Sequence, residues 1–317
     1  MRPYKRAFIF QNPNSGSAKN AARARLQRVL ESIADSIELV IVEDGNPLVE
    51  SARDAVANGA DLLVAAGGDG TVREVATALV DTGTPLGIVP LGTFNNFARS
   101  LNIPLDPAAA CQVILKGQTR KVDVGLANDK YHFFEAAGIG VDADLFPVGE
   151  EIKRGHVTAL IQGVRLALAH KPSRLELQFD RSLAHAYTAS YLGQVELSRR
   201  RRRFRSRKRR TRLRCSFIAV ANGPYYGGNF TICPSAELDD GLFSIAVFRD
   251  FSRTELLLHF WSISRGRRLY NPKLEVFVAA CLEVSAPKPL SVHVDGVPIG
   301  QTPARFVVLP HALNVLV

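Results

Sequence analysis

Short apolar segments alternate with amphipathic ones through the first 120 residues, and this alternation constrains the fold more than any other feature. The apolar segments lie at 7–10, 39–42, 61–66 and 86–91, and the helical ones at 17–34, up to 59, at 72–80, up to 101 and at 106–117. Strands without a polar face are buried on both sides. The pattern therefore predicts an α/β domain over residues 1–120, with a parallel sheet and helices on both faces.

The sequence pattern changes near residue 121, where strand-like segments begin to follow one another without helical segments between them. They lie at 121–126, 131–138, 174–179, 186–197, 214–221, 242–248 and 282–294, with one helical stretch at 157–170. A last strand is expected within 304–309, and 313–317 is expected to return and close an edge. Residues 121–317 are thus predicted to form a mostly antiparallel β-sandwich. A return of the last residues to the first domain stays open.

The net charge of +10 is a local feature. The run from Arg199 to Arg214 holds eleven arginines and one lysine, and without these twelve the 40 basic residues become 28, against 30 acidic ones. The run is interpreted as a solvated loop between two strands, or as a tether to an anionic membrane surface. Phe204 is its one aromatic residue, which disfavours base stacking and hence nucleic acid as a partner.

Several classes of protein do not fit this sequence. No apolar run approaches the 18 residues that a transmembrane helix needs, and the apolar stretch at 7–10 is too short for a signal peptide. The cysteines, Cys111, Cys215, Cys233 and Cys281, form no C-x-x-C pair, and no two histidines are spaced i, i+4. We therefore expect a cytoplasmic protein without a disulfide framework or a zinc site.

Three loops follow predicted strands and precede predicted helices, at 12–17, 67–71 and 90–96. Ligands of α/β sheets bind at the carboxyl ends of strands, where helix N-termini attract anions. Glycines let the backbone approach a polyphosphate, and Thr71 and Thr93 could cap a helix or donate to a phosphate. Asp69 is unusual beside phosphate unless it holds Mg²⁺ or activates a nucleophile. Each loop alone could be an ordinary turn, but the three together predict a nucleotide site.

The same loops resemble the signatures of a known family. Asn12-Pro-Asn-Ser-Gly16, Gly67-Gly-Asp-Gly-Thr71 and Pro90-Leu-Gly-Thr-Phe-Asn-Asn-Phe-Ala-Arg99 are similar to those of the diacylglycerol kinase catalytic family, which includes bacterial lipid kinases and sphingosine and ceramide kinases. Later segments resemble its second-domain motifs in the same order, at 122–125, 220–228, 233–234, 238–242 and 294–296. The loops match neither G-x-x-x-x-G-K-[ST] nor G-x-G-x-x-G.

The resemblance implies a two-domain fold of the NAD kinase and diacylglycerol kinase type, with ATP bound between the domains and its phosphoryl group transferred to a lipid alcohol such as diacylglycerol. It implies nucleotide contacts from Asn12, Ser15, Gly16, Gly67, Gly68, Asp69, Gly70, Thr71, Thr93 and Asn95. Asp69 and Asp295 would be the catalytic carboxylates. Mg²⁺ would be bound by Asp240 with the backbone carbonyls of Glu237 and Leu242.

The sequence also departs from the family pattern. The glutamate of the family's D-G-E motif, a general base, is Val297 here, and the usual N-D pair of the third loop is Asn95-Asn96. A substitute base formed by His293 and Asp295 is one hypothesis. A catalytically weak or inactive nucleotide-binding protein, or an NAD kinase, are the alternatives. The identity of the lipid and the oligomeric state stay open.

Overall fold

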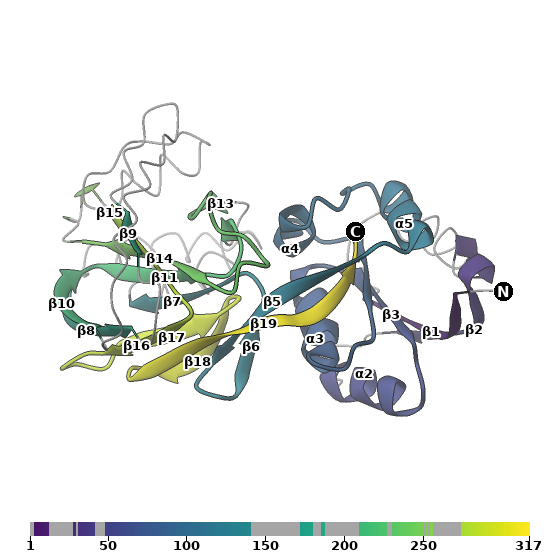
Figure 1. The fold of residues 1–317 in the computed structure, drawn as a ribbon, viewed down its shortest axis with the longest axis horizontal. Helices are drawn as coiled ribbons and strands as arrows, with labels where there is room; N and C mark the ends of the chain where they lie inside the picture. Colours follow the sequence, from purple (N-terminus) through teal and green to yellow (C-terminus); the bar gives the residue numbers. More distant parts are fainter. Residues whose placement is uncertain are drawn as a thin grey trace, which may run out of the picture. The chain divides into compact units, whose positions relative to one another are not determined.

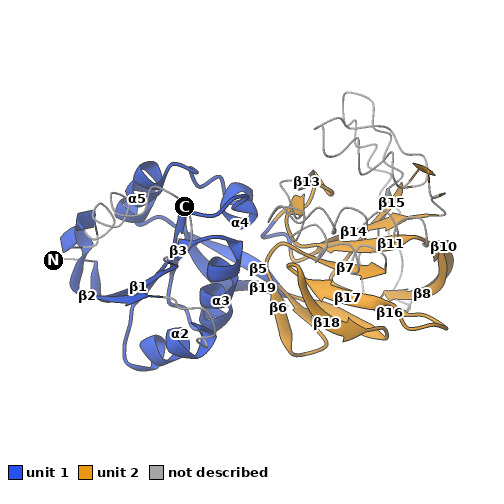
Figure 2. Cartoon of the chain, turned by 180° about the vertical axis from the view of Figure 1, so that it is seen from behind, with its two compact units in different colours: residues 1–124, 238–240, 309–317 blue, residues 125–237, 241–308 orange. Residues whose placement is uncertain are grey.

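The computed structural model (Figure 1) describes residues 3–12, 28–29, 31–41, 48–140, 172–179, 185–187, 209–226, 230–249, 252, 254–255 and 274–317. The chain divides into two compact units (Figure 2). Unit 1 comprises Met1–Val124, Leu238–Asp240 and Leu309–Val317, and unit 2 comprises Gly125–Glu237 and Gly241–Val308. Both β5 and the C-terminal strand β19 contribute residues to each unit.

Unit 1 is built on a parallel sheet. Its strands β1 (Tyr4–Gln11), β2 (Ala34–Ile41), β3 (Leu62–Gly67) and β4 (Leu86–Pro90) lie in the order β4-β3-β1-β2. Every neighbouring pair is parallel, and the end of β19 (Ala304–Leu316) runs parallel to β4, with Val315 opposite Leu86. The parallel sheet predicted for this domain is confirmed.

Helices cover both faces of this sheet. They are α2 (Leu48–Ala57), α3 (Asp69–Leu79), α4 (Asn96–Ser100) and α5 (Pro107–Lys116). Ile9 and Val64 pack in one cluster with Cys111 and Ile114 of α5, whereas α2 and α3 cover the opposite face (Figure 1). The predicted capping of α5 is confirmed, because the Asp106 side chain accepts the Ala109 N–H at 2.8 Å.

Unit 2 is a β-sandwich. Its strands are β5 (Thr119–Ala127), β6 (Tyr131–Phe133), β7 (Ala136–Gly140), β8 (Ser173–Phe179), β9 (His185–Tyr187), β10 (Arg209–Cys215), β11 (Phe217–Ala221), β12 (Tyr225–Tyr226), β13 (Phe230–Thr231), β14 (Phe243–Phe248), β15 (Leu274–Ala279), β16 (Cys281–Ser285), β17 (Ser291–Val294), β18 (Val297–Gln301) and β19. One sheet has the order β18-β17-β7-β11-β14-β15-β9, with antiparallel neighbours throughout. Strands β10, β8, β16 and β19 face it across a core that includes Leu177, Phe243 and Phe306. The antiparallel second domain is confirmed.

Several predicted strands are divided in the structure. The segment 214–221 belongs to β10 and β11, which lie in different sheets, and 282–294 divides in the same way into β16 and β17. Apolar residues lie on both sides of Ser216, so the sequence pattern hides the corner there, whereas Pro287, Lys288 and Pro289 interrupt the second segment. The expected strand at 304–309 and the return at 313–317 form one continuous strand, β19. The predicted helix at 157–170 lies outside the described residues.

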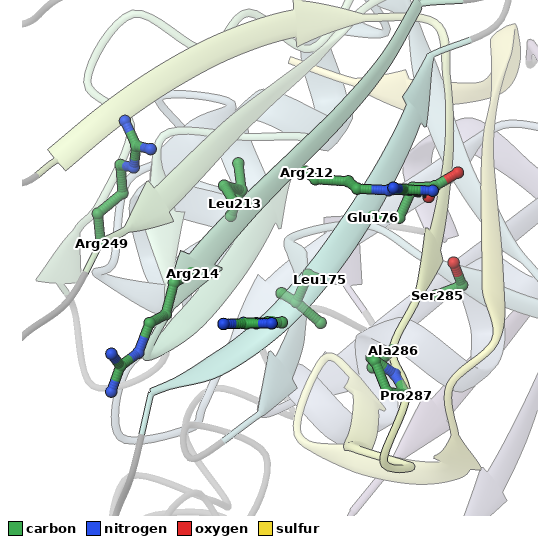
Figure 3. A pocket seen from close by; sticks show the side chains of 10 residues that line it. Leu175, Glu176, Arg212, Leu213, Arg214, Arg249, Ser285, Ala286 and Pro287 are labelled. Carbon is green, nitrogen blue, oxygen red and sulfur yellow. Dashed lines mark hydrogen bonds and ion pairs between the residues drawn. The ribbon is translucent and has the colours of Figure 1, made fainter.

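The arginine run is not a loop throughout, which corrects the prediction. Its last residues form β10, paired antiparallel with β8. Leu213 and Cys215 point into the core, and Arg212 and Arg214 are exposed on the other face. The alternation of side chains along a strand places Arg210, Arg212 and Arg214 on the exposed face, opposite the apolar core face. Arg212 and Arg214 line a cavity of about 790 Å³ in unit 2 (Figure 3). Residues 199–208 lie outside the described residues.

Candidate functional site

The predicted phosphate-binding loops lie at one edge of the unit 1 sheet, at the carboxyl ends of β1, β3 and β4. The Asn12 N–H donates to the Ala66 carbonyl at 3.2 Å, and the Leu91 N–H donates to the Gly67 carbonyl at 2.9 Å. Parallel strands in register bring Asn12 and the second and third loops together. Ser15 and Gly16 lie outside the described residues.

The Thr71 side chain packs against Gly67 in the second loop. A Cβ placed on Gly67 would lie 2.5 Å from the Thr71 Oγ1, and Thr71 is buried. The glycine at 67 is therefore needed to make room for the threonine side chain. The prediction that Thr71 donates to a phosphate stays untested, and its contacts here are with the loop itself.

The second and third loops contact each other through their backbones. A Cβ on Gly92 would lie 2.5 Å from the Gly68 Cα, and a Cβ on Gly68 would lie 3.2 Å from the Gly92 Cα. Any larger side chain at 92 would force the loops apart, since the nearest atom belongs to the backbone. The glycines at both positions are thus explained by this approach.

Asn95 closes the third loop. Its backbone adopts the left-handed conformation with φ 53°, which asparagine tolerates. Its side-chain Oδ1 accepts the Gly92 N–H and its Nδ2 donates to the Gly92 carbonyl, both at 2.9 Å. The Asn95 backbone N–H donates to the Asp69 carboxylate at 3.0 Å, which joins the two loops. Thr93 remains exposed at the tip.

Helix α3 begins at Asp69, three residues earlier than the sequence pattern predicts. Its cap residue is Gly68, which has no side chain to bond the N–H groups of the first turn, and a helix N-terminus attracts anions. Gly70 is exposed, and no described heavy atom lies within 4 Å of the position a Cβ would take there. Glycine backbone, open space and a helix N-terminus together fit a phosphate group. The half-buried Asp69 places one carboxylate beside it.

In unit 2, Asp295 fixes a neighbouring segment of backbone. Asp295 and Gly296 have φ of 43° and 81° and form the two-residue turn between β17 and β18. The Asp295 carboxylate accepts the N–H groups of Phe134, Glu135 and Ala136 at 2.8, 3.0 and 3.0 Å. These contacts give Asp295 a structural role, and the prediction that it is also catalytic stays untested.

Substituting Asp295 by Asn is expected to lower the free energy of unfolding by about 3 kcal/mol, because an amide cannot accept three N–H groups as a carboxylate does. Urea unfolding measures the change. Asp129→Asn is the matched control, since Asp129 pairs with Arg305 at the surface and should cost under about 1 kcal/mol. Unchanged stability of the Asp295→Asn protein would show that these three hydrogen bonds do not stabilise the fold.

His293 does not suit the role of a substitute base. It is 1% exposed, its Nδ1 accepts the Gly296 N–H at 3.2 Å, and its Nε2 bonds the Tyr226 hydroxyl at 2.9 Å. An imidazole that accepts at Nδ1 carries its proton on Nε2, so both nitrogens are occupied in the neutral ring. The hypothesis of a His293–Asp295 base therefore finds no support in these contacts.

Sequence reasoning missed Glu135. Its carbonyl accepts the N–H groups of Asn222 and Gly223 at 2.9 and 3.1 Å, and its own N–H donates to Asp295. The backbone of this half-buried glutamate is thus held from two sides. The available signal was a single carboxylate inside the otherwise apolar stretch 133–139.

The predicted metal ligands lie around a turn at 238–241. In unit 1, the Leu238 carbonyl accepts the Asp123 N–H at 2.6 Å, and Asp239 pairs with Arg120 at 2.8 Å. Asp240 and Glu237 are exposed, and Leu242 is half-buried. No group of three or more His, Cys, Asp or Glu side chains in the described segments is placed to hold a metal. A carboxylate oxygen and backbone carbonyl oxygens are the ligands that a hard cation prefers, so the proposed ligands fit Mg²⁺ chemically.

Comparison with known proteins decides the family. Residues 6–127 match the family described as the diacylglycerol kinase catalytic domain. Residues 159–317 match the YegS C-terminal NAD kinase beta sandwich-like domain, and this second match covers half of the chain. The chain belongs to the diacylglycerol kinase catalytic family. It is accordingly a member of a phosphotransferase family.

Relatives of this kinase family resemble the chain over almost its whole length. Proteins named diacylglycerol kinase from Staphylococcus aureus strains bovine RF122 / ET3-1 and NCTC 8325 / PS 47 are each 28% identical, covering 98% of this chain and 92% of their own. A crystal structure of a diacylglycerol kinase from Bacillus anthracis str. Sterne aligns with a TM-score of 0.72 at 18% identity, covering 100% and 98% of the two chains. The two-domain fold is thereby confirmed. The described part of the chain contains no helix long and apolar enough to cross a bilayer.

Proposed function

We propose that the protein is a lipid kinase that transfers the γ-phosphoryl group of ATP to the hydroxyl of a lipid alcohol such as diacylglycerol. The observation that carries the proposal is the backbone contact between the loops at 67–71 and 91–96, beside the uncapped N-terminus of α3. Membership of the family and the names of the Staphylococcus aureus relatives support it.

The unit 1 loops would hold the polyphosphate of ATP. The N–H groups of Asp69, Gly70 and Thr71 would donate to phosphate oxygens, and Gly68 and Gly92 would let the backbone approach. Asn12, Ser15, Gly16, Thr93 and Asn95 would complete the nucleotide contacts, Asn95 by shaping its loop. Phosphoryl transfer depends mainly on positioning and charge, so a rigid pair of loops is the main requirement.

Mg²⁺ bound by Asp240 and the carbonyls of Glu237 and Leu242 would neutralise phosphate charge when present. Asp69, at the first residue of α3, would orient the transferring group. Its carboxylate is already oriented by the Asn95 N–H, so it needs little rearrangement.

We propose that Glu135 is the general base that accepts the proton of the lipid hydroxyl. It would replace the glutamate of the family's D-G-E motif, which this chain lacks. Val297 cannot accept a proton, and the nitrogens of His293 are engaged. Glu135 adjoins the same Asp295–Gly296 turn that precedes Val297, and its backbone is fixed there. A carboxylate on a rigid backbone is a suitable general base.

Glu135→Gln is expected to lower kcat about a hundredfold with little change in the KM for ATP, because only proton transfer is affected. Adding Val297→Glu should restore much of the rate, since position 297 is exposed and carries the base in the family pattern. Glu283→Gln, on β16, is the control. A rate unchanged by Glu135→Gln would show that the proton leaves by another route.

A panel of acceptors tests the proposed function. Purified protein is incubated with labelled ATP and, separately, with diacylglycerol, sphingosine, ceramide or NAD. Label in a lipid supports the lipid kinase, whereas label in NAD alone identifies an NAD kinase. Tight ATP binding without transfer to any acceptor would identify a nucleotide-binding protein without turnover.

A lipid substrate also requires access to a bilayer. We include in the proposal that the protein works in the cytoplasm at the surface of an anionic membrane, with the run from Arg199 to Arg214 drawing it there. Each basic side chain near an anionic leaflet contributes about 1 kcal/mol of binding.

A further inference from the structure

The peptide group between Phe94 and Asn95 is held from both sides by charged side chains. Its N–H donates to the Asp69 carboxylate at 3.0 Å, and its carbonyl oxygen accepts a hydrogen bond from the Arg99 Nε at 2.8 Å. All four residues belong to unit 1. One peptide plane therefore connects the carboxylate of the second loop with a guanidinium on α4.

Arg99 contacts the third loop through its backbone as well as through its side chain. It is half-buried, and its backbone N–H donates to the Asn95 carbonyl at 3.0 Å. The backbone of Arg99 is thus bound to the same residue whose peptide group its side chain contacts. A charged donor forms a stronger hydrogen bond than a neutral one, and the planar guanidinium loses little conformational freedom when it donates.

The backbone conformation of Asn95 depends on contacts of this kind. Its φ of 53° is uncommon for a residue with a side chain, and such a conformation persists only where the surrounding structure holds it. Rotation of the Phe94–Asn95 peptide by half a turn would bring Asn95 out of the left-handed region. It would also turn the Phe94 carbonyl toward the Asp69 carboxylate, where two oxygens would repel each other.

The hydrogen bonds at the two ends of this peptide strengthen each other. A donor at the carbonyl oxygen polarises the amide group, which makes its N–H a better donor to the carboxylate. Because the Asn95 N–H points at the Asp69 carboxylate, the orientation of the carboxylate depends on that of the peptide. The orientation of the peptide depends in turn on Arg99.

We infer that Arg99 is a positioning residue for phosphoryl transfer, acting on Asp69 through the Phe94–Asn95 peptide. It keeps the Asn95 N–H directed at the carboxylate, and the carboxylate keeps the orientation that transfer requires at the start of α3. A displacement of about 1 Å at a reacting centre can cost about a hundredfold in rate. The inference deepens the proposed function and rests on it for the role of Asp69. The peptide contact can be measured without ATP or acceptor, so the two can fail separately.

Two substitutions that remove the same charge distinguish the hydrogen bond of Arg99 from its charge. Glutamine carries an N–H donor at the same number of bonds from the backbone as the arginine Nε, whereas methionine has the same length and no donor. Arg99→Met is expected to lower kcat with a short-chain soluble diacylglycerol about tenfold, with the KM for ATP within about twofold of wild type. Arg99→Gln should keep kcat within about threefold of wild type. Arg53→Met, at an exposed position of α2, is the control and should leave kcat unchanged.

Hydrogen exchange of the Asn95 amide, followed by NMR in the protein without ATP, measures the peptide contact itself. Exchange is expected to be at least about tenfold faster in Arg99→Met than in wild type or Arg99→Gln, because the N–H leaves the Asp69 carboxylate when the peptide turns. The Leu91 amide, which donates to the Gly67 carbonyl, is the internal control. Its exchange should be the same in all variants if the loop ends of the sheet stay folded.

Three results would overturn the inference. Equal losses of kcat in Arg99→Met and Arg99→Gln would mean that Arg99 acts through its charge. An Asn95 amide equally protected in both variants would mean that Arg99 does not orient the peptide. Faster exchange with an unchanged kcat in Arg99→Met would mean that the peptide does not position Asp69. If wild type transfers phosphate to no acceptor, the proposed function fails, and the Asn95 exchange rate still decides whether Arg99 holds the peptide.

Discussion

Replacing Asp69 by Asn should lower the rate of phosphoryl transfer at least a hundredfold, a barrier increase of about 2.7 kcal/mol, without unfolding the protein. The carboxylate stands at the first residue of α3, next to the N–H groups that we assign to the phosphates. Asparagine keeps an oxygen that can accept the Asn95 N–H, so the contact between the loops survives. The charge alone is removed, and steady-state kinetics with saturating ATP measure the effect.

The control is Asp54→Asn, an exposed carboxylate of α2 on the same unit. It should leave the rate and the melting temperature unchanged. If Asp69→Asn keeps more than about a tenth of the activity, a loss below about 1.4 kcal/mol, then Asp69 has no part in catalysis.

Gly92→Ala is expected to abolish ATP binding and to destabilise unit 1 by about 1–3 kcal/mol. The added Cβ would lie 2.5 Å from the Gly68 Cα and 2.9 Å from the Asn95 Oδ1, and backbone cannot move aside as a side chain can. The loops would move apart, and the phosphate site that they form would be lost. Urea unfolding and equilibrium binding of ATP measure the two effects.

The Gly70→Ala variant distinguishes an effect on ATP affinity from an effect on folding stability. No described atom lies near the new Cβ, and alanine is favoured over glycine in a helix, so stability should stay constant or rise slightly. If phosphate occupies this space, ATP affinity falls at least tenfold all the same. ATP binding as tight as in wild type would place the phosphates elsewhere.

The sequence predicts the architecture well because it is encoded in local patterns. Uninterrupted apolar strands such as 62–67 require cover on both faces, and Asp106 with Gly117 marks both ends of α5. The corner at Ser216 could not be predicted, since apolar periodicity does not reveal which of two sheets a strand joins. Pro287 and Pro289 do mark a break at 286–290, which the prediction of one strand over 282–294 overlooked. The sequence pattern did not indicate strand β10, because arginines dominate its composition.

For the site, the sequence predicts that the loops at 67–71 and 90–96 lie together, but it does not reveal what each of their residues contacts. Thr71 and Asn95 were assigned to the nucleotide, and the structure shows their side chains engaged in building the loops. Asp295 was assigned to catalysis, and its carboxylate holds the backbone at 134–136. The role of Asp295 depends on contacts with residues 159 to 161 positions away, which no local pattern encodes.

A transfer assay with position-labelled ATP tests the central claim most directly. Purified protein is incubated with diacylglycerol in neutral detergent micelles and Mg²⁺, with label in either the γ- or the α-phosphate of ATP. The account predicts γ-label, and no α-label, in a lipid phosphate monoester, and no labelled lipid with the Asp69→Asn variant. Protein that binds ATP but labels neither diacylglycerol nor another lipid alcohol would contradict it.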